Sequence, residues 1–289
     1  MTELGIPILP SLRHLSYVRR PVVSTFSMPR LSHITGYGGL LPVGIGLLSQ
    51  LTHVTLHLLR EDATGIEEFA NALHRMTNLK DLSLNLQGCT VSVHLLPMDT
   101  TAFPKPHSVH VDRLAISIAD EMREYSALLF DALVHLRPSI YELCLKRKGM
   151  DPDMFLRPSK NPLLLHSHTI KIHTPARFDP LEIVERLTKV CSTVRMVHFD
   201  TPQAEGLIRL FAELLREDAW ERIRSIRHLR FEGCDLFSEY TVEVLANNFL
   251  RGEAKNGPQC LEVISCKKIS EDFLCGLRDE FGDNLKWTL

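Results

Sequence analysis

The histidines between positions 166 and 173 have residue types and spacing that could bind a metal ion. His166, Ser167 and His168 closely precede His173, and imidazole nitrogens are frequent zinc ligands. On an extended strand, however, His166 and His168 would point to the buried side and His173 to the opposite side. Because the three rings could not converge, we expect no metal site here. No motif in the chain indicates another cofactor.

A glycine-rich stretch starts at Gly36-Tyr37-Gly38-Gly39 and continues to Gly44 and Gly46. Stretches of this kind can approach a phosphate group closely, as nucleotide-binding loops do. This one lacks the Gly-Lys-Ser/Thr ending of a phosphate-binding loop and does not complete a dinucleotide-binding fingerprint. We therefore interpret it as a flexible loop.

The chain has seven cysteines, an odd number, and no two of them have the C-x-x-C spacing of a zinc or redox site. They do not form a secreted disulfide framework, so we interpret them as reduced thiols of a cytoplasmic or nuclear protein. No Ser–His–Asp or Cys–His arrangement can be identified. We expect a protein that is not an enzyme, although an α/β hydrolase or a nucleotide-binding enzyme stays open as an alternative.

Composition limits the classes of partner. The 289 residues are 44% hydrophobic and 24% charged, which is typical of a folded globular chain, and the formal net charge is −2. Binding to nucleic acid or to an anionic membrane needs a surplus of positive charge. The N-terminus is acidic at Glu3, and the most apolar stretch, 39–48, is about half as long as a membrane-spanning helix. We predict no nucleic-acid binding, no export signal and no membrane span.

Two segments near the C-terminus align when one is shifted by 32 positions. The aligned residues are Leu229 with Leu261, Phe231 with Val263, Cys234 with Cys266, Phe237 with Ile269, and Ser238-Glu239 with Ser270-Glu271. The shared pattern is two apolar residues around one variable residue, followed by a cysteine, an apolar residue and a serine. An internal repeat of this length is typical of solenoid proteins.

The apolar-variable-apolar part of this pattern recurs along the chain. It occurs at Leu15/Tyr17, Val54/Leu56, Leu82/Leu84, Leu114/Ile116, Leu143/Leu145, Ile170/Ile172, Val197/Phe199, Leu229/Phe231 and Leu261/Val263. Such alternation predicts short strands with one buried face. The nine units are mostly about 27 to 32 residues apart, and the longer first gap predicts an irregular insertion over 19–50.

Helical patterns lie between the predicted strands. Their N-terminal capping signals are Thr64 with Glu67, Asp179 with Glu182, Ser238 and Ser270. Pro138 is expected to follow the end of the second helix. The predicted helices span 67–76, 124–136, 181–191, 205–223, 240–250 and 272–281.

A unit of one strand and one helix is too small to bury its own apolar face, so stacked units must share a core. The middle residue of most apolar pairs is polar, for example Thr55, Lys171 and Glu262. A doubly wound sheet, covered on both faces, would have continuous apolar strands instead. One face must therefore meet water, which predicts an α/β solenoid, a horseshoe with a parallel sheet on its concave face and helices on its convex face.

These repeats resemble the leucine-rich-repeat family, and the segments 226–239 and 258–271 resemble its cysteine-containing subtype. The irregular spacing and the tail 269–282 are similar to the repeat regions of fungal F-box proteins. In that family the repeats capture a substrate, and a separate N-terminal F-box docks onto the adaptor of a cullin–RING ubiquitin ligase. The resemblance implies a scaffold for protein–protein interaction and, more specifically, substrate recognition for such a ligase.

The chain departs from the F-box pattern in its N-terminal part. A strand-like unit begins by Leu12, and Leu41-Pro42-Val43, the one echo of the F-box signature, lacks the acidic residue and the amphipathic helix that should follow. Adaptor binding is therefore expected only if an F-box is supplied elsewhere, and a repeat remnant without ligase function stays open. We predict a single repeat domain over 1–289 with a C-terminal cap at 283–289.

Alternate residues of each strand should project from the concave face, where a partner would bind. Four long cations, Arg113, Lys146, Lys171 and Arg230, are the expected main contacts, because they pair well with carboxylates. Histidines of this face could make binding depend on pH, but we favour their being merely tolerated polar residues. The predicted partner-binding residues are His53, His57, Asp81, Asn85, Arg113, Glu142, Lys146, Lys171, His173, His198, Asp200, His228, Arg230, Glu232 and Glu262.

Overall fold

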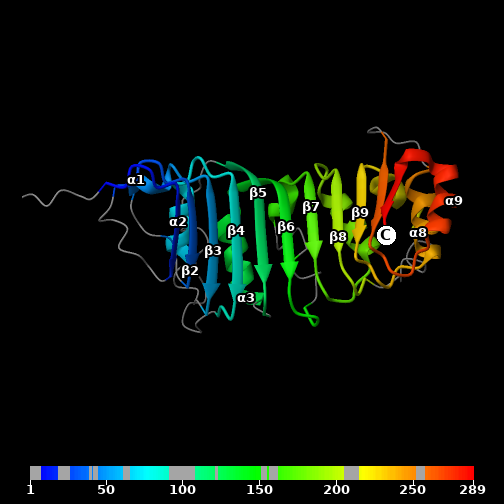
Figure 1. The fold of residues 1–289 in the computed structure, drawn as a ribbon, viewed down its shortest axis with the longest axis horizontal. Helices are drawn as coiled ribbons and strands as arrows, with labels where there is room; N and C mark the ends of the chain where they lie inside the picture. The colour runs from blue at the N-terminus through cyan, green and yellow to red at the C-terminus, as the bar shows by residue number, and fades with distance from the viewer. Residues whose placement is uncertain are drawn as a thin grey trace, which may run out of the picture. The chain divides into compact units, whose positions relative to one another are not determined.

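The computed structural model describes residues 8–18, 27–38, 41, 45–60, 66–90, 108–120, 123–150, 155, 162–204, 215–251 and 258–289. Within these ranges the chain alternates β-strands with α-helices and short 3₁₀ helices. It divides into two compact units, Met1–Ser139 and Ile140–Leu289. In each unit the strands lie side by side in chain order, with helices behind them (Figure 1).

The first unit contains a parallel sheet in which every neighbouring pair of strands from β1 to β5 runs in the same direction. Its strands are β1 (His14–Val18), β2 (His33–Tyr37), β3 (His53–Leu59), β4 (Asp81–Gln87) and β5 (Val109–Ile118). Its helices are α1 (Ile45–Leu48), α2 (Ile66–His74) and α3 (Arg123–Leu133). The next strand, β6 (Leu136–Leu145), begins in this unit and passes into the second at Ile140.

The second unit repeats the arrangement, again with parallel pairs from β6 to β11. Its strands after β6 are β7 (Thr169–His173), β8 (Met196–Asp200), β9 (His228–Glu232), β10 (Cys260–Ile264) and β11 (Leu285–Thr288). Its helices are η5 (Pro162–His166), α5 (Pro180–Val190), α7 (Glu217–Ile223), α8 (Glu239–Phe249), α9 (Glu271–Phe281) and η6 (Gly282–Asn284).

Apolar and polar residues alternate along the strands, so each sheet has one buried face and one face exposed to solvent. In β3, Val54, Leu56 and Leu58 are buried, whereas Thr55 and His57 between them are partly exposed. The buried side chains of neighbouring strands stack in register, so the rings of Phe199 and Phe231 lie 5.5 Å apart and nearly parallel. Each fully buried side chain of this size contributes about 1.5–3 kcal/mol to folding. The prediction of an α/β chain with a parallel sheet is confirmed.

The cysteines of the aligned repeats are buried, as expected for small apolar residues. The Cys266 thiol lies within hydrogen-bonding range of the Ile264 carbonyl, 3.4 Å away, and Cys234 lies 3.5 Å from the Thr201 hydroxyl. Contact with Cys266 and burial both raise the pKa of Cys234. The same contact lowers the pKa of Cys266. Both side chains contact the backbone at the turn that follows each strand.

The predicted helix caps are confirmed at three helices. The side chains of Asp179, Ser238 and Ser270 accept hydrogen bonds from the first-turn amides of α5, α8 and α9. Gly282 ends α9 with a positive φ of 61°, which glycine adopts without strain. Each of these three helices begins one residue earlier than predicted.

Several predicted helix details were wrong. Glu182 does not complete a capping box but pairs with Arg186 one turn later. The helix predicted over 124–136 ends at Leu133, and Pro138 lies inside β6 rather than after a helix. Thr64 and residues 205–214 lie outside the described residues, so only α7 represents the helix predicted over 205–223.

The interval 19–50, expected to be irregular, contains the regular strand β2. The sequence signal failed because the second inward position is Gly36 instead of an apolar residue. A β-carbon there would lie 2.6 Å from the Tyr17 hydroxyl, so the ring of Tyr17 occupies the space that a side chain would fill. Gly36 and Tyr37 are thus strand residues and not part of a flexible loop. The expected cap at 283–289 contains β11, which pairs with β10.

Among the described residues, no helix combines the length and the apolar character needed to cross a membrane.

The packing at Gly36 predicts opposite effects for two glycine substitutions. Gly36→Ala should destabilise the protein by about 1–3 kcal/mol, because the new methyl group collides with Tyr17. Gly276→Ala, on α9, meets no atom within 4 Å and should stabilise by about 0.5–1 kcal/mol, since alanine favours helix. Urea denaturation of the two variants measures both effects, and equal effects of the two would contradict this account.

The cap of α5 predicts a pH effect on stability. Burial raises the pKa of Asp179 to about 6, more than its bonds to the helix amides lower it. A carboxyl with a raised folded pKa favours folding at low pH, and this contribution is lost as the pH rises from about 4 through about 6. Asp179→Asn keeps a capping oxygen without a charge. Across this window it should gain roughly 2–3 kcal/mol relative to the wild type. Thermal melts at a pH below and a pH above this window test the prediction. Ser238→Asn, an exchange at a cap that carries no charge, is the control and should show no such gain.

Candidate partner-binding face

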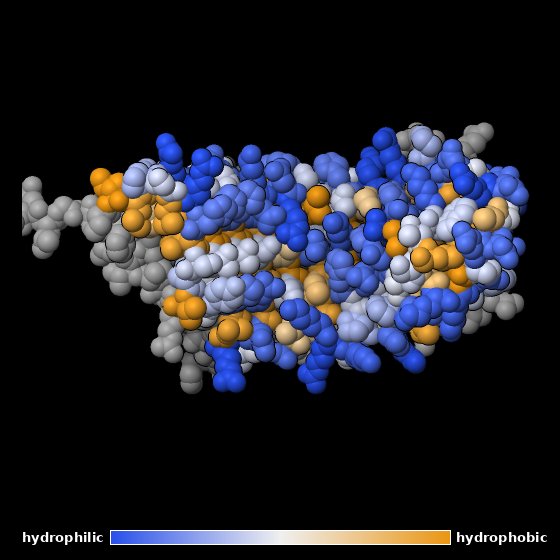
Figure 2. All heavy atoms as spheres, viewed as in Figure 1, coloured by the Kyte–Doolittle hydropathy of each residue, from blue (hydrophilic) through white to orange (hydrophobic). Residues whose placement is uncertain are grey.

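The strand face turned away from the helices carries the predicted partner-binding residues, and we call it the open face of each unit. Register between strands places its side chains in rows that cross the sheet. In the first unit the first row is His14, His33, His53, Asp81 and Arg113; the second is Ser16, Thr35, Thr55, Ser83 and Ala115; and the third is Val18, Tyr37, His57, Asn85 and Ser117. Figure 2 shows this face, with a pale band of intermediate hydropathy crossing the first strands.

Aromatic rings stack along two rows of the first unit. The His14 and His33 ring centroids are 4.1 Å apart, and those of His33 and His53 are 4.2 Å apart with rings nearly parallel. In the third row, Tyr37 and His57 stack at 4.4 Å. Between these rows lie the small hydroxyl side chains of the second row. On the open face of the first unit, a row of mostly hydroxyl side chains therefore lies between two rows that contain stacked rings.

Arg113 lies in an ion pair within the same sheet. Its guanidinium is 3.3 Å from the Asp81 carboxylate and donates a hydrogen bond to the Ser83 hydroxyl at 3.2 Å. The two charges largely neutralise each other, so Arg113 contributes less to attracting an acidic partner than its sequence position suggested.

The open face of the second unit is more highly charged. Its first row is Ile140, Thr169, Met196, His228 and Cys260; the second is Glu142, Lys171, His198, Arg230, Glu262 and Lys286; and the third is Cys144, His173, Asp200, Glu232, Ile264 and Thr288. In the second row, three basic side chains lie between two acidic ones, and Lys286 follows. Charge pairing therefore decides which of them can contact a partner.

Arg230 is the centre of a network of ion pairs. Its guanidinium lies 2.7 Å from Glu232 and 3.5 Å from Glu262. Each of these carboxylates also contacts an imidazole at 3.0 Å, His198 for Glu232 and His228 for Glu262. Hydrogen bonding from Arg230 lowers the pKa of Glu232. Burial, with a smaller effect of Arg230, lowers the pKa of His198 and of His228.

A second, smaller group surrounds His173. Its Nδ1 lies 3.1 Å from Asp200, and its Nε2 lies 3.7 Å from Glu142. The two carboxylates thus approach one ring from neighbouring strands. All the predicted residues from Glu142 to Glu262 that lie on strands are brought onto this single face.

The predicted cationic contacts divide into two kinds. Arg113 and Arg230 are held by carboxylates of their own sheet. Lys171 lies on β7 between Glu142 and His198, is partly exposed, and forms no ion pair with a described residue. Lys146 is exposed and directly follows the end of β6. Of the four predicted cations, lysines 171 and 146 are therefore the best placed to pair with a partner.

Sequence reasoning missed His33, the middle ring of the first row. Its strand was hidden by Gly36, although its spacing of two from Thr35 on a strand would have placed it there. The histidines considered for a metal site lie differently from the prediction. His166 ends η5 instead of lying in a strand, and both it and His168 are exposed while Ser167 is buried. In the described part of the chain, no group of three or more side chains is arranged to hold a metal ion.

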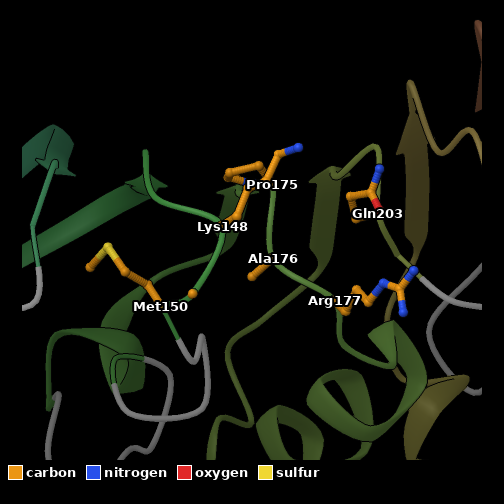
Figure 3. Close-up of a pocket in the computed structure, with 7 residues that line it drawn as sticks. Lys148, Met150, Pro175, Ala176, Arg177 and Gln203 are labelled. Carbon is orange, nitrogen blue, oxygen red and sulfur yellow. The ribbon is translucent and has the colours of Figure 1, made fainter.

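A cavity of about 380 Å³ lies at the carboxyl ends of β6, β7 and β8 in the second unit. It is lined by Lys148, Gly149, Met150, Pro175, Ala176, Arg177 and Gln203. In Figure 3, Arg177 and Gln203 lie on one side of Ala176, and Met150 lies on the other. The carboxyl ends of parallel strands are where α/β enzymes bind their ligands. The described residues of the lining, however, include no carboxylate, imidazole, thiol or hydroxyl side chain for acid–base or nucleophilic chemistry.

No family model matches the chain, and no curated protein matches it at a significant level.

The network around Arg230 predicts a measurable shift in two histidines. Arg230→Met removes a positive charge near His198 and His228, so the pKa of both rings should rise. The variant should also lose about 1 kcal/mol of stability, since two partly buried carboxylates lose their partner. NMR titration of the ring protons measures the pKa values. Lys267→Met, which removes a cation paired elsewhere with Asp235, is the control and should leave both pKa values unchanged. Unchanged pKa values of His198 and His228 in Arg230→Met would refute the network.

Proposed function

We propose that this chain is a scaffold for protein–protein interaction whose open face binds a protein partner. One observation carries the proposal: polar, partly exposed side chains stand in rows on one face of each sheet, while the apolar residues of the opposite face are buried. A purely structural layer would not need a polar face so rich in charged and aromatic groups.

The physical argument is preorganisation. Side chains on hydrogen-bonded strands are already fixed, so a partner loses little entropy in ordering them. Arg230, Glu232 and Glu262 hold one another in place, and Lys171, which has no ion pair with any residue that the structure describes, lies beside this network. A face with both signs of charge suits a protein surface better than a uniform polyanion.

We also propose that the successive strand-and-helix repeats of the chain are leucine-rich repeats stacked as a horseshoe. Support comes from the repeat of 32 positions, from the alternation of short strands with helices, and from the buried, equivalent Cys234 and Cys266. On this basis the chain would recognise substrates for a cullin–RING ubiquitin ligase if an F-box is supplied elsewhere. Reduced thiols at all seven cysteines fit a cytoplasmic or nuclear location.

The alternative of an α/β hydrolase or nucleotide-binding enzyme gains no support from the cavity near Lys148 and Arg177. The described residues of its lining supply positive charge and an amide but none of the groups that transfer protons or attack carbonyl carbon. The proposal therefore assigns binding, and not catalysis, to this chain.

Photocrosslinking from single positions tests the proposed function. A photoreactive amino acid at Lys171 should capture a defined protein from the native cell type. The same residue at Glu243, exposed on α8, should not capture it. With that protein purified, Lys171→Ala should weaken binding about tenfold, as expected for a contact worth about 1.4 kcal/mol.

Lys268→Ala is the matched control, because Lys268 is exposed in a loop away from the open face; it should leave the affinity unchanged. Capture of the same proteins from Lys171 and Glu243 would contradict the proposal. Recovery of a cullin adaptor with the captured protein would support the ligase function. A partner without the adaptor would leave a scaffold alone, and no specific partner would favour a repeat remnant.

A further inference from the structure

We propose that the ladder of His14, His33 and His53 on the first unit binds a carboxylate-rich segment of a protein partner, with an affinity that rises as the pH falls below 7. This inference rests on the proposed function, since it names the chemistry of the partner. It concerns a different unit and different residues from those tested by crosslinking at Lys171.

The ladder is a built feature of the sheet. Its three rings occupy equivalent positions on β1, β2 and β3, where register aligns His14 with His33 and His33 with His53. They are stacked at 4.1 and 4.2 Å. His14 and His53 are exposed, and His33 between them is partly exposed. A partner lying across the strands could touch all three rings at once.

Hydroxyl groups fix the orientation of two of the rings. The Ser32 hydroxyl lies 2.8 Å from His33 Nδ1, and the Thr52 hydroxyl lies 2.9 Å from His53 Nδ1. Each bond uses one ring nitrogen. The other, Nε2, has no hydrogen-bond partner among the described residues and is available to a ligand. When a ring is protonated, its Nε2–H becomes a charged donor, which carboxylates accept strongly.

The surroundings of the ladder favour an anionic ligand. Beyond His53 the row continues to Asp81, but this carboxylate is engaged by Arg113 at 3.3 Å. The hydroxyls of the second row, such as Thr35 and Thr55, can donate hydrogen bonds to a carboxylate or to a peptide carbonyl. In the third row the nearest ring groups are Tyr37 and His57, which stack on each other.

Proton uptake and ligand binding must be coupled at this site. Positive charge on the rings of His14 and His53, centred 4.1 and 4.2 Å from that of His33, disfavours a proton on His33 between them. Burial, and the neighbouring rings of His53 and His14, lower the pKa of His33. Carboxylates laid along the ladder would offset this repulsion and favour the protonated rings. By linkage, affinity for such a ligand must then increase as protons become available.

Peptide binding tests the inference directly. The probe is a fluorescent peptide of about ten residues that alternates Gly and Glu, compared with the matching Gly and Gln peptide. Glutamate stays ionised down to about pH 4.3, so only the protein titrates between about pH 7.5 and 5.5. The Glu peptide should bind at least about fivefold more tightly at the lower pH, with a rise in the pKa of His33. The Gln peptide should show no such change.

Variants assign the effect to the ladder. Replacing all three rings by Asn should abolish the pH dependence, and His33→Asn alone should reduce it. His168→Asn, which removes an exposed histidine of the second unit, should leave it intact. Asp81→Asn should bind the Glu peptide as well as the wild type or better, because a competing carboxylate is gone. If the triple variant does not fold, NMR of the wild type still shows whether the Glu peptide binds at the ladder. Binding there should shift the His33 ring signals, and unshifted signals would contradict the inference.

Equal affinity at both pH values, equal binding of the two peptides, or pH dependence that survives removal of the ladder would overturn the inference. A failure here would leave a partner crosslinked at Lys171 unaffected. Conversely, absence of such a partner would not remove binding of the Glu peptide to the ladder. The outcome of the peptide experiment is therefore independent of the outcome of the crosslinking experiment.

Discussion

The structure depends on the register of parallel strands. Hydrogen bonds between neighbouring backbones align equivalent residues, such as Leu229 with Leu261 and Arg230 with Glu262. A slip of one residue would exchange the buried and the exposed faces of a strand. Because the buried face contributes most of the apolar stabilisation, the register is strongly fixed, and the arrangement of the open face follows from it.

Register turns a repeated sequence position into a row of touching side chains. On the buried side this produces stacked apolar residues, such as Phe199 on Phe231. On the open side it brings together groups that would otherwise repel or remain apart, including three histidines in the first unit and the carboxylates around Arg230 in the second. The same constraint therefore supplies both the core and the chemistry of the candidate binding face.

The sequence was sufficient to predict strands where two apolar residues flank a polar one, because burial of that pair decides the local fold. It was insufficient at β2, where the inward position is Gly36 and the space is filled by Tyr17 from the preceding strand. It also could not predict which cations are paired. Arg113 and Lys171 have the same kind of sequence context, but Arg113 has Asp81 within 3.3 Å. Ion pairing depends on cross-strand neighbours that are about 30 residues away in the chain.

The two open faces consequently offer different means of recognition. In the first unit, rings and hydroxyls carry little net charge near neutral pH, so contact there depends on shape, hydrogen bonds and protonation. In the second unit, Arg230 is already compensated by Glu232 and Glu262. A partner that inserted a charge at that position would have to break existing pairs, whereas a carboxylate placed at Lys171 would not. Specificity on this face therefore comes as much from the pairs that are already satisfied as from a cation, such as Lys171, that no described carboxylate engages.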